Sequence, residues 1–408
     1  MSRHTLMFGW EYPPFHTGGL GVACQGMVRG LLQNGVKVTL VLPMDVDKHP
    51  ESDYLRGPST EIPVIRFVPS ALQPYEGMEE FAMRMQREGK TVGTSVQDLY
   101  GPDLGEAVQR FADMSVAITE DIDADVIHCH DWMTYEAGIR AAEHHGIPLV
   151  AHIHATEFDR TDFHPNQWIY DQERRGFHAA DKIIAVSNYT KNLLINHYGV
   201  PADKIAVVYN GHESKPVVQA DIITSEEKRK TPLVLFLGRL TVQKNPWQFL
   251  NAAALIHEQR PDVQFVMAGE GGMMGELMDQ ACALGLSDNI VFTGKVNRRE
   301  ADALYRSASC FVMPSLSEPF GLVALEAIAH GTPVVLSKQS GAAEVIEHAF
   351  KVDFWDTDYM ADCILTILRE EPLAEQLSSE APHVLTRLSW KNQAAAIDSI
   401  YSQLLPSF

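Results

Sequence analysis

Cysteine is scarce in this sequence, and the few cysteines present are widely scattered. The 408 residues contain five of them, at positions 24, 129, 282, 310 and 363, an odd number without Cys-x-x-Cys spacing. This pattern argues against structural disulfides and against a thiolate metal site. A reducing compartment, the cytoplasm, is therefore the expected location.

Positive charge is also in short supply. Lysine and arginine together number 33 against 53 aspartate and glutamate residues, which gives a net charge of -20. Such a surface excludes broad electrostatic binding to nucleic acid or to anionic lipid, because both need basic surfaces. An anionic small ligand stays compatible with the charge, since a few converging cations can dominate one site locally.

Long hydrophobic runs are missing as well. No apolar stretch approaches the roughly 18 residues that a membrane-spanning helix needs. The apolar run Leu6–Phe8 near the N-terminus is too short for a signal peptide. We therefore expect no integral membrane segment.

The chain does contain a regular alternation of short apolar strands with helical stretches, which predicts βαβ units and parallel sheets. A chain of this length is too long for one core and suits two domains. The candidate strands are Leu6–Phe8, Val36–Leu42, Val64–Val68, Val126–His128, Leu149–Ile153, Lys182–Val186, Ile205–Val208, Leu233–Leu237, Val263–Met267, Ile290–Phe292, Cys310–Met313 and Val334–Leu336.

One interruption divides this alternation. The stretch from Asn210 to Pro232 is charged and lacks apolar periodicity, so it is the best candidate for a linker. We therefore expect a first domain over residues 1–212, a second over 213–389 and a final helical segment over 390–408. A longer polar, methionine-rich insertion occupies residues 70–100.

The most informative stretch is Ser315–Val335, in which two glutamates are separated by seven residues. Pro319 and Gly321 interrupt regular structure, which places Glu318 on a loop and Glu326 early in a short helix. Amides at a helix start bind anions, and carboxylates accept hydrogen bonds from sugar hydroxyls. This favours a ligand with both phosphate and hydroxyl groups. The plainer alternative is a helix capped by a loop carboxylate, with the second glutamate in solvent.

A family resemblance strengthens the first interpretation. The segment S-E-P-F-G-L-x-x-L-E-A, followed by His330-Gly-Thr-Pro-Val, resembles the donor-site signature of the retaining glycosyltransferases of family 4, relatives of glycogen and starch synthases. The resemblance implies an α/β fold with two Rossmann-like domains facing across a cleft, called GT-B. It also implies that Glu318 orients donor-sugar hydroxyls and Glu326 the ribose, while the amides of Phe320, Gly321 and Leu322 contact sugar and phosphate.

Two cations follow the candidate strand Leu233–Leu237 in the pattern G-R-L-x3-K, namely Arg239 and Lys244. Arginine offers a planar fork of donors and lysine a compact charge, which together can hold a diphosphate. The alternative is two surface cations after a strand. In the resembled family the same pattern binds the donor diphosphate, so the resemblance assigns Arg239 and Lys244 to the leaving group.

A glycine-rich loop joins the first candidate strand to the helix predicted over Val22–Asn34. Gly18 and Gly19 stand where a side chain would block close approach of a ligand, although such a pair can also serve only as a tight turn. In relatives this loop contacts donor and acceptor. Glycogen and starch synthases commonly carry Lys-x-Gly-Gly-Leu there, whereas this chain has His16 in place of the lysine, which weakens the case for ADP-glucose.

Histidines end two neighbouring candidate strands. His128-Cys-His130-Asp131-Trp132 could suggest a metal site, but a flanking cysteine and i, i+2 spacing are weak support. The segment resembles the family's H-x-H-D-W, which places Asp131 and Trp132 near acceptor or donor sugar. By position, His154 matches the family histidine at the reacting sugar, and Arg160 is assigned to the acceptor side. No metal is expected, because no Asp-x-Asp triplet ends a strand.

Two further segments agree with the family in order and spacing. Gly269-Glu-Gly-Gly272 forms another glycine turn after a strand, and Val291-Phe-Thr-Gly-Lys295 matches the segment around the nucleotide base. Lys295 is therefore assigned to donor binding.

The resemblance implies a retaining hexosyltransferase without a required cofactor. The favoured version extends an α-glucan from ADP- or UDP-glucose, as glycogen synthase does. One alternative is a hexosyl or hexosaminyl transferase to a small acceptor or polysaccharide precursor, including sucrose-phosphate synthase-like chemistry. An alternative of another class is a noncatalytic protein that binds sugar nucleotides.

Overall fold

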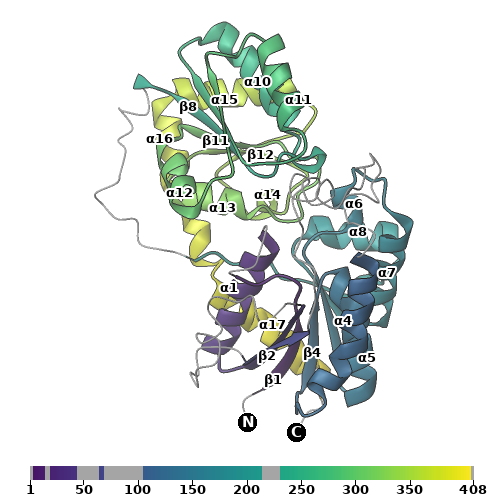
Figure 1. The fold of residues 1–408 in the computed structure, drawn as a ribbon. Coiled ribbons are helices and arrows are strands. Elements are labelled where there is room, and N and C mark those ends of the chain that lie inside the picture. Colours follow the sequence, from purple (N-terminus) through teal and green to yellow (C-terminus); the bar gives the residue numbers. More distant parts are fainter. Residues whose placement is uncertain (1–2, 14–18, 44–63, 69–103, 214–229, 406–408) are drawn as a thin grey trace. The chain divides into compact units, whose positions relative to one another are not determined.

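The computed structural model describes residues 3–13, 19–43, 64–68, 104–213 and 230–405 (Figure 1). The chain divides into two compact units. Unit 1 comprises Met1–Glu157, His164–Glu213 and Leu388–Phe408, and unit 2 comprises Phe158–Phe163 and Ser214–Arg387. The short segment 158–163 lies inside the predicted first domain but groups with unit 2. The insertion predicted over 70–100 lies outside the described residues.

Unit 1 is built on a parallel sheet with the strand order β3-β2-β1-β4-β5-β6-β7 among the described residues. Its strands read as nearly continuous apolar runs, because helices cover both faces of a parallel sheet. They are β1 (His4–Phe8), β2 (Lys37–Pro43), β3 (Val64–Val68), β4 (Val126–His130), β5 (Leu149–Ile153), β6 (Lys182–Ala185) and β7 (Ile205–Val207).

The helices of unit 1 begin and end at ordinary capping residues. Asn166 and Ser187 accept hydrogen bonds from the first-turn amides of α7 and α8, and Gly146 and Gly199 end α5 and α8 in the left-handed conformation. The helices are α1 (Gly19–Gln33), α4 (Leu104–Thr119), α5 (Trp132–His145), α7 (Gln167–Ala179), α8 (Asn188–Tyr198), the 3-10 turn η3 (Ala202–Lys204) and α17 (Trp390–Leu404). The short helix α6 (Glu157–Arg160) spans the division between the units.

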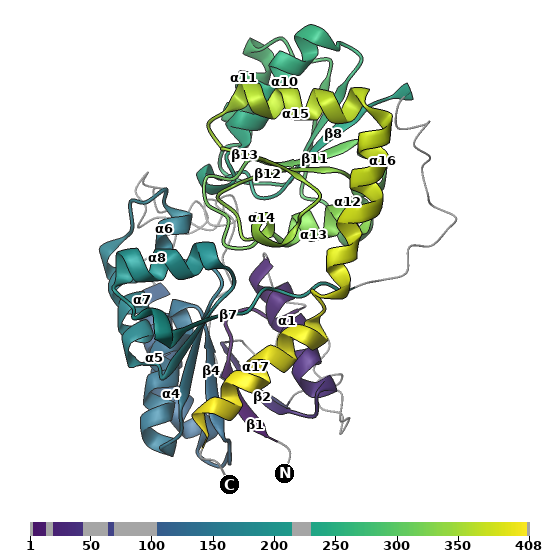
Figure 2. The same ribbon diagram turned by 180° about the vertical axis from the view of Figure 1, so that it is seen from behind.

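The C-terminal helix α17 packs in unit 1, beside α1 and on the same face of the sheet (Figure 2). Three glycines permit this close packing. A Cβ at Gly26 would lie 2.2 Å from the Trp390 ring, and one at Gly30 would lie 2.3 Å from the Trp390 carbonyl oxygen. At Gly211 a Cβ would lie 2.5 Å from the Trp390 amide nitrogen. The opposite face of the sheet carries α4 and α5 (Figure 1).

Unit 2 is built on a second parallel sheet with the order β10-β9-β8-β11-β12-β13 among the described residues. The strands are β8 (Leu233–Leu237), β9 (Gln264–Ala268), β10 (Ile290–Gly294), β11 (Cys310–Met313), β12 (Val334–Ser337) and β13 (Phe350–Val352). The helices are η5 (Val242–Lys244), α10 (Pro246–Gln259), α11 (Met274–Ala283), α12 (Arg298–Ser307), α13 (Leu322–Ala329), α14 (Ala342–Val345), α15 (Thr357–Arg369), α16 (Glu371–Glu380) and η6 (Ala381–Thr386).

The glycine turn after β9 brings two loops of unit 2 into backbone contact. Gly269 has a φ of +134°, and a Cβ there would lie 1.9 Å from the carbonyl oxygen of Gly238. Gly238 in turn donates its amide hydrogen to the carbonyl of Ala268 at 3.0 Å. Glycine at 269 therefore lets the chain that carries Arg239 lie directly against the end of β9.

We expect Gly269→Ala to lower the free energy of unfolding of unit 2 by about 2–4 kcal/mol. Alanine there would have a strained backbone conformation, and its Cβ would overlap the Gly238 carbonyl oxygen. Denaturant unfolding followed by tryptophan fluorescence measures this. Gly275→Ala is the matched control, since a Cβ at Gly275 in α11 meets no atom within 4 Å. That control is expected to be neutral or to stabilise by up to about 1 kcal/mol. Equal stability of the two variants would contradict the expectation.

Candidate functional site

The two carboxylates singled out in the sequence lie close together along the chain in unit 2, one before α13 and one within it. Glu318 belongs to the loop that joins β11 to α13, and Glu326 lies in α13. The loop is fixed by backbone hydrogen bonds, since Glu318 donates to Gln339 at 2.9 Å and accepts from the Gly341 amide at 3.0 Å. The Glu318 side chain is therefore held on a rigid support.

The Glu318 carboxylate is almost fully buried and has two partners. It forms an ion pair with the Lys244 ammonium, and the Ser315 hydroxyl donates a hydrogen bond to it at 3.2 Å. The side chains of Lys244 and Glu318 are 19% and 8% exposed. The attraction within a charge pair this well shielded is stronger than in a surface pair. Removing either partner would leave the other charge buried without a counter-ion, which destabilises the fold.

The loop that carries the two predicted cations is bonded to the loop that carries Glu318. Gln243 donates to the carbonyl of Ser317 at 3.1 Å, and Asn245 donates to the carbonyl of Pro314 at 3.1 Å. Asn245 has a φ of 53°, which turns the chain from η5 into α10. Arg239 is exposed and has no ion-pair partner among the described residues. One cation is thus open to a ligand, and the other is shared with Glu318.

The start of α13 lies immediately after this loop. Gly321 has a φ of +103°, and a Cβ there would lie 2.9 Å from the Met313 methyl group, so glycine fits and other residues do not. Phe320 before it is buried, and Leu322 begins the helix. Amides in the first turn of a helix have no carbonyl partner within the helix, and they carry its positive end. The turn is therefore suited to an anion.

Glu326 belongs to a separate polar group, formed with α12. Its carboxylate accepts from Arg298 at 3.0 Å and from the Tyr305 hydroxyl at 3.1 Å. Burial raises the pKa of Glu326, while Arg298 and Tyr305 oppose the rise. The ring of His330 stacks on Tyr305 at 5.6 Å between centroids. Lys295 belongs to neither group, because it is exposed and pairs with Glu270 at 3.4 Å.

In unit 1, the ends of β4 and β5 are joined by Asp131. Its backbone amide donates to the carbonyl of His152 at 2.9 Å, and its carboxylate accepts from the His154 amide at 2.7 Å. Trp132 starts α5, is buried, and meets the Trp168 ring edge-on at 5.3 Å. Arg160 lies on α6 in the segment that groups with unit 2. His16 and Gly18 lie outside the described residues, and Gly19 is the exposed first residue of α1.

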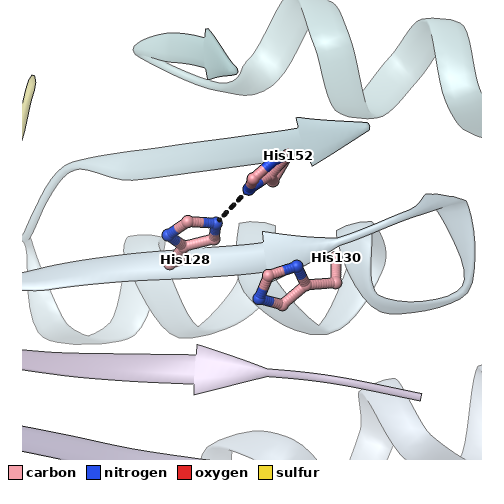
Figure 3. Close-up of side chains that lie close together, drawn as sticks. All are labelled: His128, His130 and His152. Atoms are coloured by element: carbon pink, nitrogen blue, oxygen red, sulfur yellow. Dashed lines mark hydrogen bonds between the residues drawn. The ribbon is translucent and has the colours of Figure 1, made fainter. Parts of the chain in front are cut away.

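Four histidines form a stack of rings on β4 and β5, and three of them are drawn in Figure 3. His128 stacks on His130 at 4.6 Å, and His152 stacks on His154 at 4.3 Å. His128 Nε2 and His152 Nδ1 are hydrogen-bonded at 3.1 Å, as are His130 Nδ1 and His154 Nε2 at 3.0 Å. Burial lowers the pKa of His128 to about 3 and holds those of His130 and His152 well below their usual value.

A metal site is the alternative interpretation of the same rings. Ligand nitrogens of His128, His130 and His152 lie within 4.8 Å of one another. However, the three rings lie at small angles to one another: 22° for His128 and His130, 35° for His128 and His152, and 31° for His130 and His152. Ring lone pairs lie in the ring planes, so lone pairs of stacked rings run side by side and do not converge as tetrahedral coordination requires. The arrangement favours a hydrogen-bonded stack.

Comparison with known proteins decides the family. The model of Glycosyltransferase Family 4 matches residues 17–215, and that of Glycosyl transferases group 1 matches residues 218–384. An uncharacterized glycosyltransferase of Methanocaldococcus jannaschii is 31% identical over 97% of this chain and 97% of its own. The chain belongs to glycosyltransferase family 4.

Other relatives agree with this assignment. The glycosyltransferase is 28% identical to a glycogen synthase of Mycobacterium tuberculosis, over 97% of this chain and 94% of the relative. Among solved structures, sucrose-phosphate synthase of Thermosynechococcus elongatus aligns with a TM-score of 0.76 at 18% identity, covering 98% and 99% of the two chains. Starch synthase IV of Arabidopsis thaliana, solved with ADP and acarbose, aligns with a TM-score of 0.72 at 16% identity and 99% coverage of both. These likenesses confirm the predicted GT-B fold class.

Sequence reasoning did not identify several residues that shape the sites of this glycosyltransferase. Arg298 and Tyr305 hold Glu326, and Ser315 holds Glu318. Tyr401 forms a 2.5 Å hydrogen bond with His128 from 273 residues away in the chain. A cation at the start of a helix or a tyrosine in a C-terminal helix has no signal of its own in the sequence.

Among the described residues, no helix combines the length and apolarity needed to cross a bilayer.

Proposed function

We propose that this glycosyltransferase is a retaining enzyme that moves glucose from ADP- or UDP-glucose to a hydroxyl of an α-glucan. The observation that carries the proposal is the shielded ion pair of Lys244 with Glu318. Lys244 follows the exposed Arg239 in the chain, and Glu318 precedes the start of α13. The pair joins a diphosphate-binding cation to a sugar-binding carboxylate. A ligand that carries both a diphosphate and sugar hydroxyls would match this pair.

In the proposed reaction, the donor diphosphate replaces Glu318 as the ion-pair partner of the Lys244 ammonium. Glu318 then accepts hydrogen bonds from the sugar hydroxyls, and Arg239 supplies a second cation to the diphosphate. The bond from the anomeric carbon to the diphosphate oxygen breaks while the acceptor oxygen bonds to the same face of that carbon. The acceptor's proton passes to a donor phosphate oxygen, so no side chain becomes a covalent nucleophile. Lys244 and Arg239 stabilise the charge that develops on the leaving nucleoside diphosphate.

The remaining assignments follow the family resemblance. We assign the Glu326 carboxylate to the donor ribose, Lys295 to the base side and the amides from Phe320 to Leu322 to sugar and phosphate. His154 is assigned to the reacting sugar. Arg298 and Tyr305 each bond one oxygen of the Glu326 carboxylate, and each oxygen has a second lone pair that a ribose hydroxyl can use.

Two comparisons support glucose and a glucan. A glycogen synthase matches 97% of this chain, and starch synthase IV was solved with ADP and acarbose. For the glucan acceptor, the residues that we propose to contact it are His16, Asp131, Trp132 and Arg160. Gly18 and Gly19 are proposed to approach the donor.

The test is a panel of ADP-, UDP- and GDP-sugars, each incubated with the purified protein with and without glycogen or short maltooligosaccharides. Released nucleoside diphosphate is measured. We expect one glucose donor to give release that the glucan stimulates. Release without glucan stimulation would keep the transferase and replace the acceptor with a small molecule or polysaccharide precursor. Tight donor binding with no release from any donor would overturn the enzyme in favour of a noncatalytic binding protein.

A further inference from the structure

Two histidines that the proposed reaction does not use contact the one that it does. We propose that His130 and His152 are positioning residues that hold the imidazole of His154 in one orientation and one tautomer. The proposal rests on the proposed function, which assigns His154 to the reacting sugar. Its observations are the 3.0 Å contact of His130 Nδ1 with His154 Nε2 and the stacking of His152 on His154 at 18°.

Three contacts restrain the backbone and the ring of His154. Its backbone amide is fixed by the Asp131 carboxylate at 2.7 Å. The rotation of a histidine ring about its χ2 bond is otherwise broad. Stacking on His152 sets the plane of the ring. The hydrogen bond between His130 Nδ1 and His154 Nε2 sets which edge of the ring faces His130.

The neutral state of His130 makes this restraint specific for a tautomer. His130 and His152 are fully buried, and burial lowers the pKa of both. When the His154 imidazole is neutral as well, one nitrogen of the His130–His154 pair must donate and the other must accept. The tautomer of His154 is therefore tied to that of His130. A phenylalanine at position 130 could fill the space of the ring but could not transmit this choice.

The stack is anchored from outside the two strands. The Tyr401 hydroxyl of α17 meets His128 Nδ1 at 2.5 Å, and His128 Nε2 meets His152 Nδ1 at 3.1 Å. His130 and His152 are also direct neighbours in the register of β4 and β5. A chain of hydrogen bonds thus runs from the C-terminal helix to the ring that stacks on His154. Second-layer hydrogen bonds of this kind orient functional histidines in other sites.

The matched pair His130→Asn and His130→Leu tests the inference. The two side chains have nearly the same shape, but only asparagine offers a polar atom near the place of Nδ1. We expect His130→Leu to lower kcat by about tenfold to a hundredfold, the scale of a misplaced reacting group. His130→Asn should stay within about fivefold of the wild type. The KM for the donor should change less than kcat in both, because the residues proposed to hold the donor diphosphate and ribose, Arg239, Lys244 and Glu326, lie in unit 2. His144→Leu, at an exposed position of α5, is the control and should leave kcat unchanged.

A measurement that needs no turnover separates this inference from the proposed function. In protein labelled with 15N-histidine, imidazole spectra report the tautomer of His154 directly. We expect a single tautomer in the wild type and in His130→Asn, and exchanging tautomers in His130→Leu. Exchange in the wild type, or equal kcat of the two His130 variants, would overturn the inference. An inactive wild type with one fixed His154 tautomer would instead refute the proposed function and leave the positioning intact.

Discussion

Replacing Lys244 with alanine is expected to lower kcat for glycosyl transfer by about a hundredfold to a thousandfold, the usual effect of removing one group that stabilises developing charge. In the proposed reaction, the Lys244 ammonium neutralises the leaving diphosphate. The loss has a second component, because Glu318 is nearly buried and loses its cation. Steady-state kinetics with the donor identified by the panel would measure the effect.

Two further variants separate these components. Lys338→Ala breaks an ion pair with Asp353 at 2.8 Å in the same unit, but on the surface, and it should leave kcat unchanged. The double variant Lys244→Ala with Glu318→Gln removes the unpaired carboxylate. It should recover folding stability without recovering kcat. An unchanged kcat in properly folded Lys244→Ala would remove Lys244 from the proposed mechanism.

The second large effect concerns acid stability. The free energy of unfolding of unit 1 is expected to fall by about 6 kcal/mol between pH 7 and pH 5 from the histidine stack alone. The pKa of His128 drops from 6.5 to about 3 on burial, and those of His130 and His152 are also well below their usual value. As pH falls below 6.5, the unfolded chain binds three protons that the folded chain does not. Stability is therefore lost on acidification down to the folded-state pKa values.

Denaturant unfolding from pH 7 to pH 5 would measure this loss. His152→Phe keeps a ring in the stack but removes one titrating group. Its stability should therefore fall less steeply, by up to about 1.4 kcal/mol per pH unit. An effect of 6 kcal/mol is comparable to the whole stability of many domains, so unit 1 should approach unfolding near pH 5. Unfolding that is independent of pH over this interval would contradict the buried, neutral stack.

The strands were the part of the fold most accessible to prediction. The runs over Val64–Val68, Leu149–Ile153 and Cys310–Met313 coincide with β3, β5 and β11. β11 shows the reason most plainly, because all four of its residues are buried and apolar, as expected of a strand covered on both faces. The strand over Val126–His128 is wrong at its end, since β4 continues to His130. Polar histidines there looked like the end of a strand, although they are buried in a stack of rings. β13 was missed because it is only three residues long and has a lysine at its centre.

The candidate site was predictable only as separate motifs. Lys244 and Glu318 were each found from their own sequence pattern, but they are 74 residues apart, and nothing in either motif indicates that they pair. The same holds for Glu326, whose partner Arg298 lies 28 residues away on another helix. Packing of two loops decides such pairs, and packing is not encoded in the local pattern. The insertion and the loop with His16 lie outside the described residues, so those predictions stay predictions.

The anomeric configuration of the product tests the central claim most directly. Donor with 13C-labelled glucose would be incubated with a maltooligosaccharide, and the newly formed linkage followed by NMR from the earliest time points. We expect an α-linked donor to give an α-linked product from the first time point. We expect Lys244→Ala to slow the formation of this product without changing its configuration. A β-linked product, or free labelled glucose in place of any extended oligosaccharide, would contradict a retaining transferase acting on a glucan.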